Sequence, residues 1–196
     1  MKHSAAETAG NIELNSMDLT KSRFTEYLVR LNTLRFKRWV FEPGMLFSSE
    51  SKWWGDKGPR GHRHNGLDLR LYEDDTGTLK TINADTKIPI IYEGKIARSI
   101  EDFLGHTLFA AHEIYEGGSQ LFTLYGHVLQ GADVFIGKSL SEGAAIATLA
   151  GAKNMKVPGH LHISVALIPK KIPIETLMWK NLNEADMLFF DPRGII

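Results

Sequence analysis

The feature that most constrains the fold is a series of short runs rich in β-branched and aromatic residues, which begins after Pro43. Turns containing glycine separate the runs, which recur at intervals of roughly ten residues with no long helical pattern between them. This arrangement is typical of an antiparallel β-sandwich or barrel, so we predict a mainly β domain. The strand candidates are Met45–Ser48, Gly66–Tyr72, Ile88–Ile91, Gly94–Ile100, His106–Tyr115, Leu121–His127, Ala132–Ile136, Ala144–Leu149 and His160–Ile168.

The residues before this region follow a helical pattern instead. From Leu19 onward, apolar side chains recur at spacings of three and four, which predicts an amphipathic helix that ends before Pro43-Gly44. Residues 1–15 are small and polar and are expected to form a loose tail. We expect the tail and helix, residues 1–42, either to pack against the sheet or to cover a functional groove as an inhibitory segment.

The remaining segments complete the predicted organisation. The polar stretch Glu73–Lys87 is predicted to be a surface loop or hairpin. Residues 170–196 mix proline, lysine and polar residues with a weakly helical segment over 174–187, and are predicted to be a short C-terminal extension. The β domain is therefore expected to span residues 43–169, between an N-terminal helix and this extension.

Composition excludes several classes of function. Lysine plus arginine and aspartate plus glutamate number 23 each, so the chain lacks the positive charge of a general nucleic-acid binder. No apolar run is long enough to span a membrane, and no signal peptide is visible in the first fifteen residues. The absence of cysteine excludes thiol catalysis, cysteine-ligated zinc and disulfides. Neither the compartment nor the oligomeric state follows from the sequence.

Five of the eight histidines lie in three short motifs. In the first motif, His64 and Asp68 are separated by Gly66, and residues i, i+2 and i+4 of an extended chain point to one face. An imidazole and a carboxylate from one segment are suitable zinc ligands. His62 and His64 also share a face, so spacing does not decide which of them would bind. A surface Asn-Gly turn with incidental histidines is the alternative interpretation.

The other two motifs add three imidazoles. Strand alternation places His160 and His162 on one face, with Cα atoms ~6.5–7 Å apart, so that one ring can bind a metal while the other contacts its water. A solvated polar face would also explain this pair. His127 is at the end of a predicted strand, where a structural role is the alternative. Together the motifs supply three ligand-type side chains and two further imidazoles, as an open catalytic zinc site requires.

The combined motifs resemble those of the LytM/lysostaphin-type zinc endopeptidases, which cut peptide bonds in bacterial cell-wall peptidoglycan. The family pattern is His-x-Gly-x-Asp, then Tyr-[Ala/Gly]-His-[Leu/Val], and finally His-Leu-His on a strand. In the same order, this chain has His64-Asn-Gly-Leu-Asp68, Tyr125-Gly-His127-Val128 and His160-Leu-His162. The resemblance covers residues 43–168 and implies a β-rich peptidase domain.

The resemblance also implies residue roles. One Zn²⁺ per chain would be held by His64, Asp68 and His162, and His127 and His160 would be the unligated catalytic residues. The expected activity is that of a metalloendopeptidase that hydrolyses peptide bonds, in peptidoglycan cross-links or stem peptides, through a zinc-activated water. Either unligated histidine can be the general base, with the other assisting the oxyanion or the leaving amine. The sequence does not order these two roles.

The chain departs from the family pattern in three respects. Ile163 and Ser164 stand where the family usually has an aromatic and then an acidic residue. The segment Arg70–Lys87 is longer than usual, and the cell-wall-binding module and export signal that accompany a periplasmic or extracellular enzyme are not visible. A catalytically idle member of the same fold, which binds a partner, is therefore the main alternative. A histidine phosphotransfer protein using His127 and His162 is a weaker one, since it leaves the first motif without a role.

Other side chains near the motifs were assigned from context. We interpret Trp53 and Trp54 as core residues, with the wall of a substrate groove as the alternative. Arg60 and Tyr125 are close in sequence to motif residues and are expected to orient a substrate.

Overall fold

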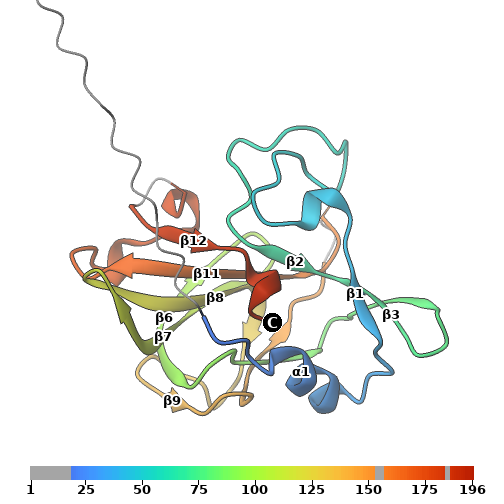
Figure 1. Ribbon diagram of the computed structural model, residues 1–196, viewed down its shortest axis with the longest axis horizontal. Helices are drawn as coiled ribbons and strands as arrows, with labels where there is room; N and C mark the ends of the chain where they lie inside the picture. The colour runs from blue at the N-terminus through green and yellow to red at the C-terminus, as the bar shows by residue number, and fades with distance from the viewer. Residues whose placement is uncertain (1–18, 153–156, 184–185) are drawn as a thin grey trace, which may run out of the picture.

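The computed structural model describes residues 19–152, 157–183 and 186–196, so the expected tail over residues 1–15 lies outside the described residues. Four long antiparallel strands form its centre (Figure 1). They are β6 (Gly94–Glu101), β7 (His106–Glu116), β8 (Ser119–Gln130) and β11 (Leu161–Pro169). Most side chains of β8 and nearly all of those of β11 are buried, as is typical of strands that are covered on both faces.

Shorter strands extend this main sheet, whose order is β12-β11-β8-β7-β6-β9. Strand β2 pairs with β11, and β10 pairs with both β8 and β5. The short strands are β2 (Leu67–Leu69), β5 (Lys87–Pro89), β9 (Ser139–Leu140), β10 (Ala145–Leu149) and β12 (Leu188–Phe190). The prediction of a mainly β, antiparallel protein is confirmed.

A second sheet and a helix lie beside the main sheet. The second sheet contains β1 (Arg38–Val40), β3 (Leu71–Glu73) and β4 (Leu79–Thr81), and the β3–β4 pair is the hairpin predicted within the polar insertion. Helix α1 (Phe24–Asn32) contributes the fully buried side chains of Phe24 and Leu28 to the core cluster that contains Leu161 and Val165 of β11.

The two faces of the main sheet have separate cores. On β11, Leu161, Ile163 and Val165 pack into the cluster that also receives α1. Side chains at the alternate positions of β11 point to the opposite face of the sheet. There, Ala166 and Ile168 pack against Leu177 and Leu182 of the C-terminal segment. His162 and Ser164 share this second face by alternation. The C-terminal segment therefore covers the side of the sheet that carries the predicted site.

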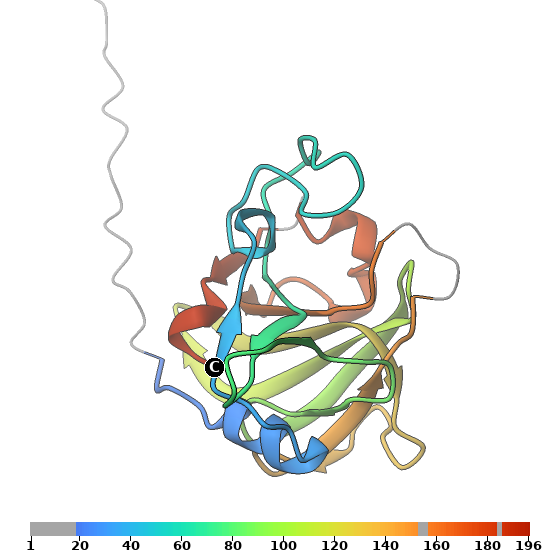
Figure 2. The ribbon, with the colours of Figure 1, turned by 90° about the vertical axis from the view of Figure 1, so that its right-hand side faces the viewer.

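Two long loops flank that side. Residues 46–66 contain no named strand, and the described residues of the C-terminal segment form the short turns η2 (Ile174–Thr176), η3 (Trp179–Asn181) and η4 (Pro192–Gly194) in addition to strand β12. Figures 1 and 2 show both regions on the same side of the main sheet. Within the described residues, no helix has the length and apolar character needed to cross a membrane.

Three expectations about individual elements were wrong. The N-terminal helix ends at Asn32 because Thr33 adopts a left-handed conformation (φ 51°), and the following residues form β1. Met45–Ser48 is not a strand, since Pro43–Met45 forms the 3₁₀ turn η1 with proline at its start. The 132–136 segment is a turn in which the Val134 N–H donates to Gly131 O.

Packing of α1 leads to a prediction about residues 1–42. Replacing the fully buried Leu28 by Ala should lower the free energy of unfolding by about 2–4 kcal/mol, because it leaves a cavity in the main core. Replacing the exposed Arg30 by Ala should change it by less than about 0.5 kcal/mol. Urea denaturation followed by circular dichroism measures both. Equal stability of the two variants would contradict a packing role for α1.

Candidate metal centre

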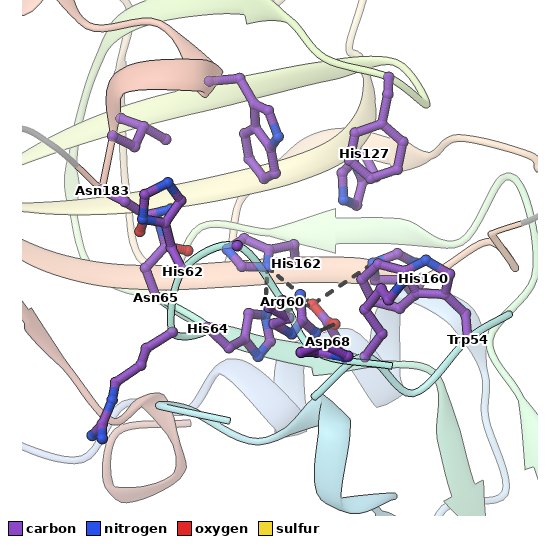
Figure 3. A pocket seen from close by; sticks show the side chains of 17 residues that line it. Trp54, Arg60, His62, His64, Asn65, Asp68, His127, His160, His162 and Asn183 are labelled. Carbon is purple, nitrogen blue, oxygen red and sulfur yellow. Dashed lines mark hydrogen bonds and ion pairs between the residues drawn. The ribbon is translucent and has the colours of Figure 1, made fainter. Parts of the chain in front are cut away.

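Strand pairing brings the three histidine motifs together. In the register of the main sheet, His162 on β11 is opposite Asp68 on β2 and also opposite Gly126 on β8. His127, His160 and His64 are one, two and four residues from these paired positions in the sequence. The resulting group of buried side chains is His64, Asp68, His127, His160 and His162, each at most 5% exposed (Figure 3).

Three of these side chains converge on one point. Asp68 Oδ1 is 3.1 Å from His64 Nε2 and 2.9 Å from His162 Nδ1, and the two ring nitrogens are 3.1 Å apart. The ligand atoms that these three residues offer all lie within 4.8 Å of one another. Gly66 permits this approach, because a Cβ at residue 66 would lie 2.6 Å from His162 Nε2 and would clash with Ile163 O.

The outer nitrogen of each imidazole has its own partner. His64 Nδ1 is 2.9 Å from Leu46 O, which can only accept, so Nδ1 carries the proton and Nε2 has a free lone pair. His162 Nε2 is 2.9 Å from Ser164 Oγ, which can accept an N–H and leave Nδ1 free as a ligand atom. Such outer hydrogen bonds orient imidazole ligands in metal sites. Ser164 therefore has a contact role despite departing from the family pattern.

The second oxygen of Asp68 is also held. Trp53 Nε1–H donates to Oδ2 at 2.7 Å, and Arg60 Nη2 lies 3.5 Å from the same atom. Burial by itself raises the pKa of the Asp68 carboxyl, but the neighbouring imidazoles of His160, His64 and His162 hold it well below its usual range. Asp68 is therefore an ionised carboxylate with Oδ1 directed at both imidazoles.

This donor set fits Zn²⁺. Two imidazole nitrogens and one carboxylate oxygen form one of the ligand combinations found in catalytic zinc sites, where a fourth position stays open. Each ligand atom is on a side chain whose remaining polar atom is engaged elsewhere. Without a cation, the two imidazole lone pairs would point at each other beside a buried negative charge. The residues present are therefore suited to holding a divalent cation.

His127 and His160 lie beside this group with a common hydrogen-bonding pattern. His127 Nδ1 is 3.0 Å from Asp102 Oδ1, and His160 Nδ1 is 2.8 Å from Pro158 O. Both Nδ1 atoms therefore face acceptors, which leaves each Nε2 free. The two rings are 4.7 Å apart between centroids, and His160 Nε2 is 3.6 Å from Asp68 Oδ1. Two proton-accepting nitrogens are thus available next to the candidate ligands.

A cavity of about 410 Å³ opens over these residues. Its walls come from the 46–66 loop and from the C-terminal segment, and it is large enough for part of a peptide. Trp54 stacks over His160 at 6.1 Å, while Trp179 lies 5.3 Å from His127 and 5.4 Å from His162, measured between ring centroids. The cavity therefore combines aromatic walls with a polar floor.

The structure decides several open points of the sequence analysis. His64 belongs to the buried group, whereas His62 is exposed at the cavity rim. Trp53 is buried, as expected, but Trp54 lines the cavity. Arg60 also lines it and additionally donates to Gly44 O. The expectation that Tyr125 orients a substrate was wrong, because its buried hydroxyl accepts from the Ile91 N–H within the core.

Sequence reasoning missed three residues of the site. Asp102 contacts His127 through both the ring and the backbone, and Phe103 and Trp179 pack against the His127 ring. Asp102-Phe103 is in the turn between β6 and β7, where an aspartate has an ordinary turn role. No local pattern links that turn or the C-terminal segment to the histidine motifs.

Comparison with known proteins gave matches among solved structures alone. No family model and no curated protein matches the sequence. The catalytic domain of the antimicrobial peptidase lysostaphin from Staphylococcus simulans is 17% identical, with a TM-score of 0.48 over 78% of this chain and 90% of that one. LytU is 20% identical, with a TM-score of 0.44 over 67% and 80% of the two chains. A variant of the catalytic domain of the prophage-encoded M23 protein EnpA from Enterococcus faecalis is 19% identical, with a TM-score of 0.35 over 64% and 83%.

The close approach at Gly66 provides a test of the candidate ligands. Replacing Gly66 by Ala should displace the His162 ring and weaken zinc binding by at least ~10-fold, because the new Cβ overlaps that ring. Gly61→Ala is the matched control, since a Cβ there meets nothing within 4 Å. Competition with a chromophoric chelator measures both affinities. Unchanged affinity of Gly66→Ala would argue against His162 as a ligand.

The buried histidines predict a pH dependence of stability for the zinc-free protein. Burial lowers the pKa of His160 and of His162 to about 4, compared with about 6.5 in the unfolded chain. Between these values the unfolded chain binds more protons, so stability should fall by roughly 2–4 kcal/mol as the pH decreases from 6.5 to 4. Below about pH 4, protonation of carboxylates that are ionised in the folded protein lowers the stability further.

Urea unfolding in the presence of a chelator, repeated across this pH range, measures the effect. His162→Gln should reduce the slope, whereas substitution of the exposed His62 by Gln should leave it unchanged. Stability that stays constant or increases towards pH 4 would show that the two rings are not held neutral by burial.

Proposed function

We propose that this protein is a zinc-dependent endopeptidase that hydrolyses peptide bonds of peptidoglycan, in cross-links or stem peptides. The observation that carries the proposal is the convergence of His64 Nε2, Asp68 Oδ1 and His162 Nδ1 beside two further buried imidazoles. A structural cluster would not need two additional histidines with free Nε2 atoms facing the same cavity. The order of the three motifs in the sequence, which resembles that of the peptidoglycan endopeptidases, supports the same assignment.

In this proposal, His64, Asp68 and His162 hold the zinc ion. Bound zinc supplies Lewis acidity, which polarises a carbonyl and lowers the pKa of a coordinated water to about 7. Leu46 O and Ser164 orient the two imidazole ligands, and Trp53 and Arg60 keep the second oxygen of Asp68 occupied, so that Oδ1 stays directed at the centre.

His127 and His160 perform the proton transfers. Each presents an Nε2 lone pair, because its Nδ1 faces an oxygen acceptor. A neutral imidazole in this state can accept a proton from the attacking water and, once protonated, can donate to the leaving amine. The aromatic walls formed by Trp54 and Trp179 suit the peptide and glycan portions of such a substrate.

The alternatives fit this geometry less well. A phosphotransfer role requires an accessible ring nitrogen, but His162 is 4% exposed and its ring lies between Asp68 and Ser164. A catalytically idle, partner-binding protein does not require the hydrogen bonds that leave Nε2 of both His127 and His160 free. We therefore treat the idle form as the outcome that the following experiment must exclude.

Zinc content and hydrolysis together test the proposal. The wild-type protein should contain about one zinc per chain and release new amino termini from peptidoglycan fragments, as detected by mass spectrometry. His162→Ala should lose the zinc, because the remaining two ligands bind weakly. His127→Ala and His160→Ala should keep it and lose hydrolysis by at least ~100-fold, the lower range for a general acid or base.

Two results would contradict parts of this assignment. Loss of zinc from His127→Ala or His160→Ala would mean that the division into ligands and proton carriers is wrong. Full zinc occupancy without cleavage of any fragment would identify the protein as the idle, partner-binding form.

A further inference from the structure

Asp102 lies in the turn between β6 and β7 and is hydrogen-bonded to His127 at two points. We propose that Asp102 is a positioning residue for hydrolysis, which holds His127 in the tautomer with its proton on Nδ1 and its Nε2 lone pair towards the cavity. This inference rests on the proposed function. It distinguishes the two unligated histidines, which the motifs alone leave equivalent.

The tautomer follows from a count of donors around the carboxylate. Oδ1 accepts from the backbone N–H groups of Leu104 and Gly105, both at 2.9 Å, and Oδ2 accepts from Thr107 Oγ1–H at 2.8 Å and from the His127 backbone N–H at 2.9 Å. The fifth neighbour is His127 Nδ1, 3.0 Å from Oδ1. A carboxylate surrounded by donors has no proton to give. His127 Nδ1 must therefore carry the proton.

The charge of Asp102 agrees with this count. Burial alone raises the pKa of its carboxyl, but hydrogen bonds from the His127 ring and backbone and from the Leu104 N–H hold that pKa well below its usual range. The group is ionised at neutral pH. A charged acceptor makes a stronger hydrogen bond to an imidazole N–H than a neutral carbonyl does.

The backbone of His127 is unusual as well. Its φ of 66° lies in the left-handed region, which costs roughly 1–2 kcal/mol for a residue with a Cβ. Asp102 Oδ2 binds the N–H of this residue, and His127 O accepts from the Ala150 N–H at 2.9 Å. One carboxylate therefore holds both the strained backbone and the ring. Strain maintained in this way is common at functional sites.

The ring has little freedom to leave this position. Phe103 packs against it with a centroid distance of 4.4 Å, and Trp179 with one of 5.3 Å. His160, in contrast, has only the neutral carbonyl of Pro158 behind its Nδ1. Of the two histidines, His127 is therefore the one whose tautomer is held by a charged partner.

The proton balance can be written for this residue. The attacking water forms the new C–O bond and loses a proton to His127 Nε2. As the C–N bond breaks, the same proton passes to the leaving amine, and His127 returns to its starting tautomer. Asp102 stays ionised throughout and stabilises the intermediate imidazolium, the role that a buried aspartate has behind a catalytic histidine in serine proteases.

Imidazole nitrogen chemical shifts in NMR test the tautomer directly in the wild-type protein. We expect His127 to be protonated on Nδ1 and bare on Nε2 at alkaline pH, with and without zinc. The opposite tautomer would overturn the inference, and this measurement needs no variant to fold.

Variants test the consequence for hydrolysis. Asp102→Asn removes the charge and one acceptor oxygen, and should lower kcat by at least ~100-fold with KM and zinc content changed by less than about twofold. Asp102→Glu should recover part of the loss. Asp74→Asn is the matched control, because Asp74 is also a buried turn carboxylate and accepts from Thr76 and Thr78, but its hydrogen bonds involve none of the site histidines. It should leave kcat unchanged.

The inference and the proposed function fail differently. If zinc-loaded wild-type protein cleaves peptides and folded Asp102→Asn cleaves them equally fast, Asp102 has no positioning role. If the wild-type protein cleaves nothing although His127 carries its proton on Nδ1, the proposed function is wrong while the hydrogen-bond assignment stands.

Discussion

The carboxylate of Asp68 is the charge on which the arrangement of the site depends. It is almost completely buried, and a buried charge is costly unless it is compensated by hydrogen bonds or a counter-ion. Trp53 and Arg60 satisfy one oxygen, and His64 and His162 face the other. The loop that contributes Trp53 and Arg60 and the two strands that contribute Asp68 and His162 are therefore tied together by a single group.

Strand register explains how this group is assembled. β11 lies between β2 and β8, and His162 is paired with Asp68 on one side and with Gly126 on the other. Neighbouring strands are about 4.8 Å apart, so directly paired residues are the closest that two strands offer. The glycines leave room for the imidazoles, as the approach of Gly66 to His162 shows. A shift of one residue in the β2–β11 pairing would turn a candidate ligand to the opposite face.

Local patterns were sufficient to predict the fold class and the three histidine motifs, but spacing left His62 and His64 equivalent, and only the resemblance to the family motifs singled out His64. Alternation along an extended chain correctly placed His160 and His162 together, because a period of two is a local property of the backbone. The contact of Asp102 with His127 spans 25 residues and depends on the β7–β8 pairing, which contains register shifts. The position of Trp179 depends on how the C-terminal segment packs on the second face of the sheet. Neither the Asp102–His127 contact nor the position of Trp179 has a signal in the local sequence, because both depend on packing between segments that are far apart in the chain.

Two of the three candidate ligands come from paired strands, whereas the third, His64, and the walls of the cavity come from loops. Asp68 and His162 are on paired strands, whereas Trp54 belongs to the long 46–66 loop and Trp179 to a segment anchored by Leu177 and Leu182. Loops tolerate insertion and exchange far better than paired strands do. The 46–66 loop carries His64 as well as one wall, so it cannot be replaced without losing a candidate ligand. The described residues of the C-terminal segment carry no candidate ligand, so exchanging that segment is a route to changing which molecules the cavity admits while all three candidate ligands stay in place.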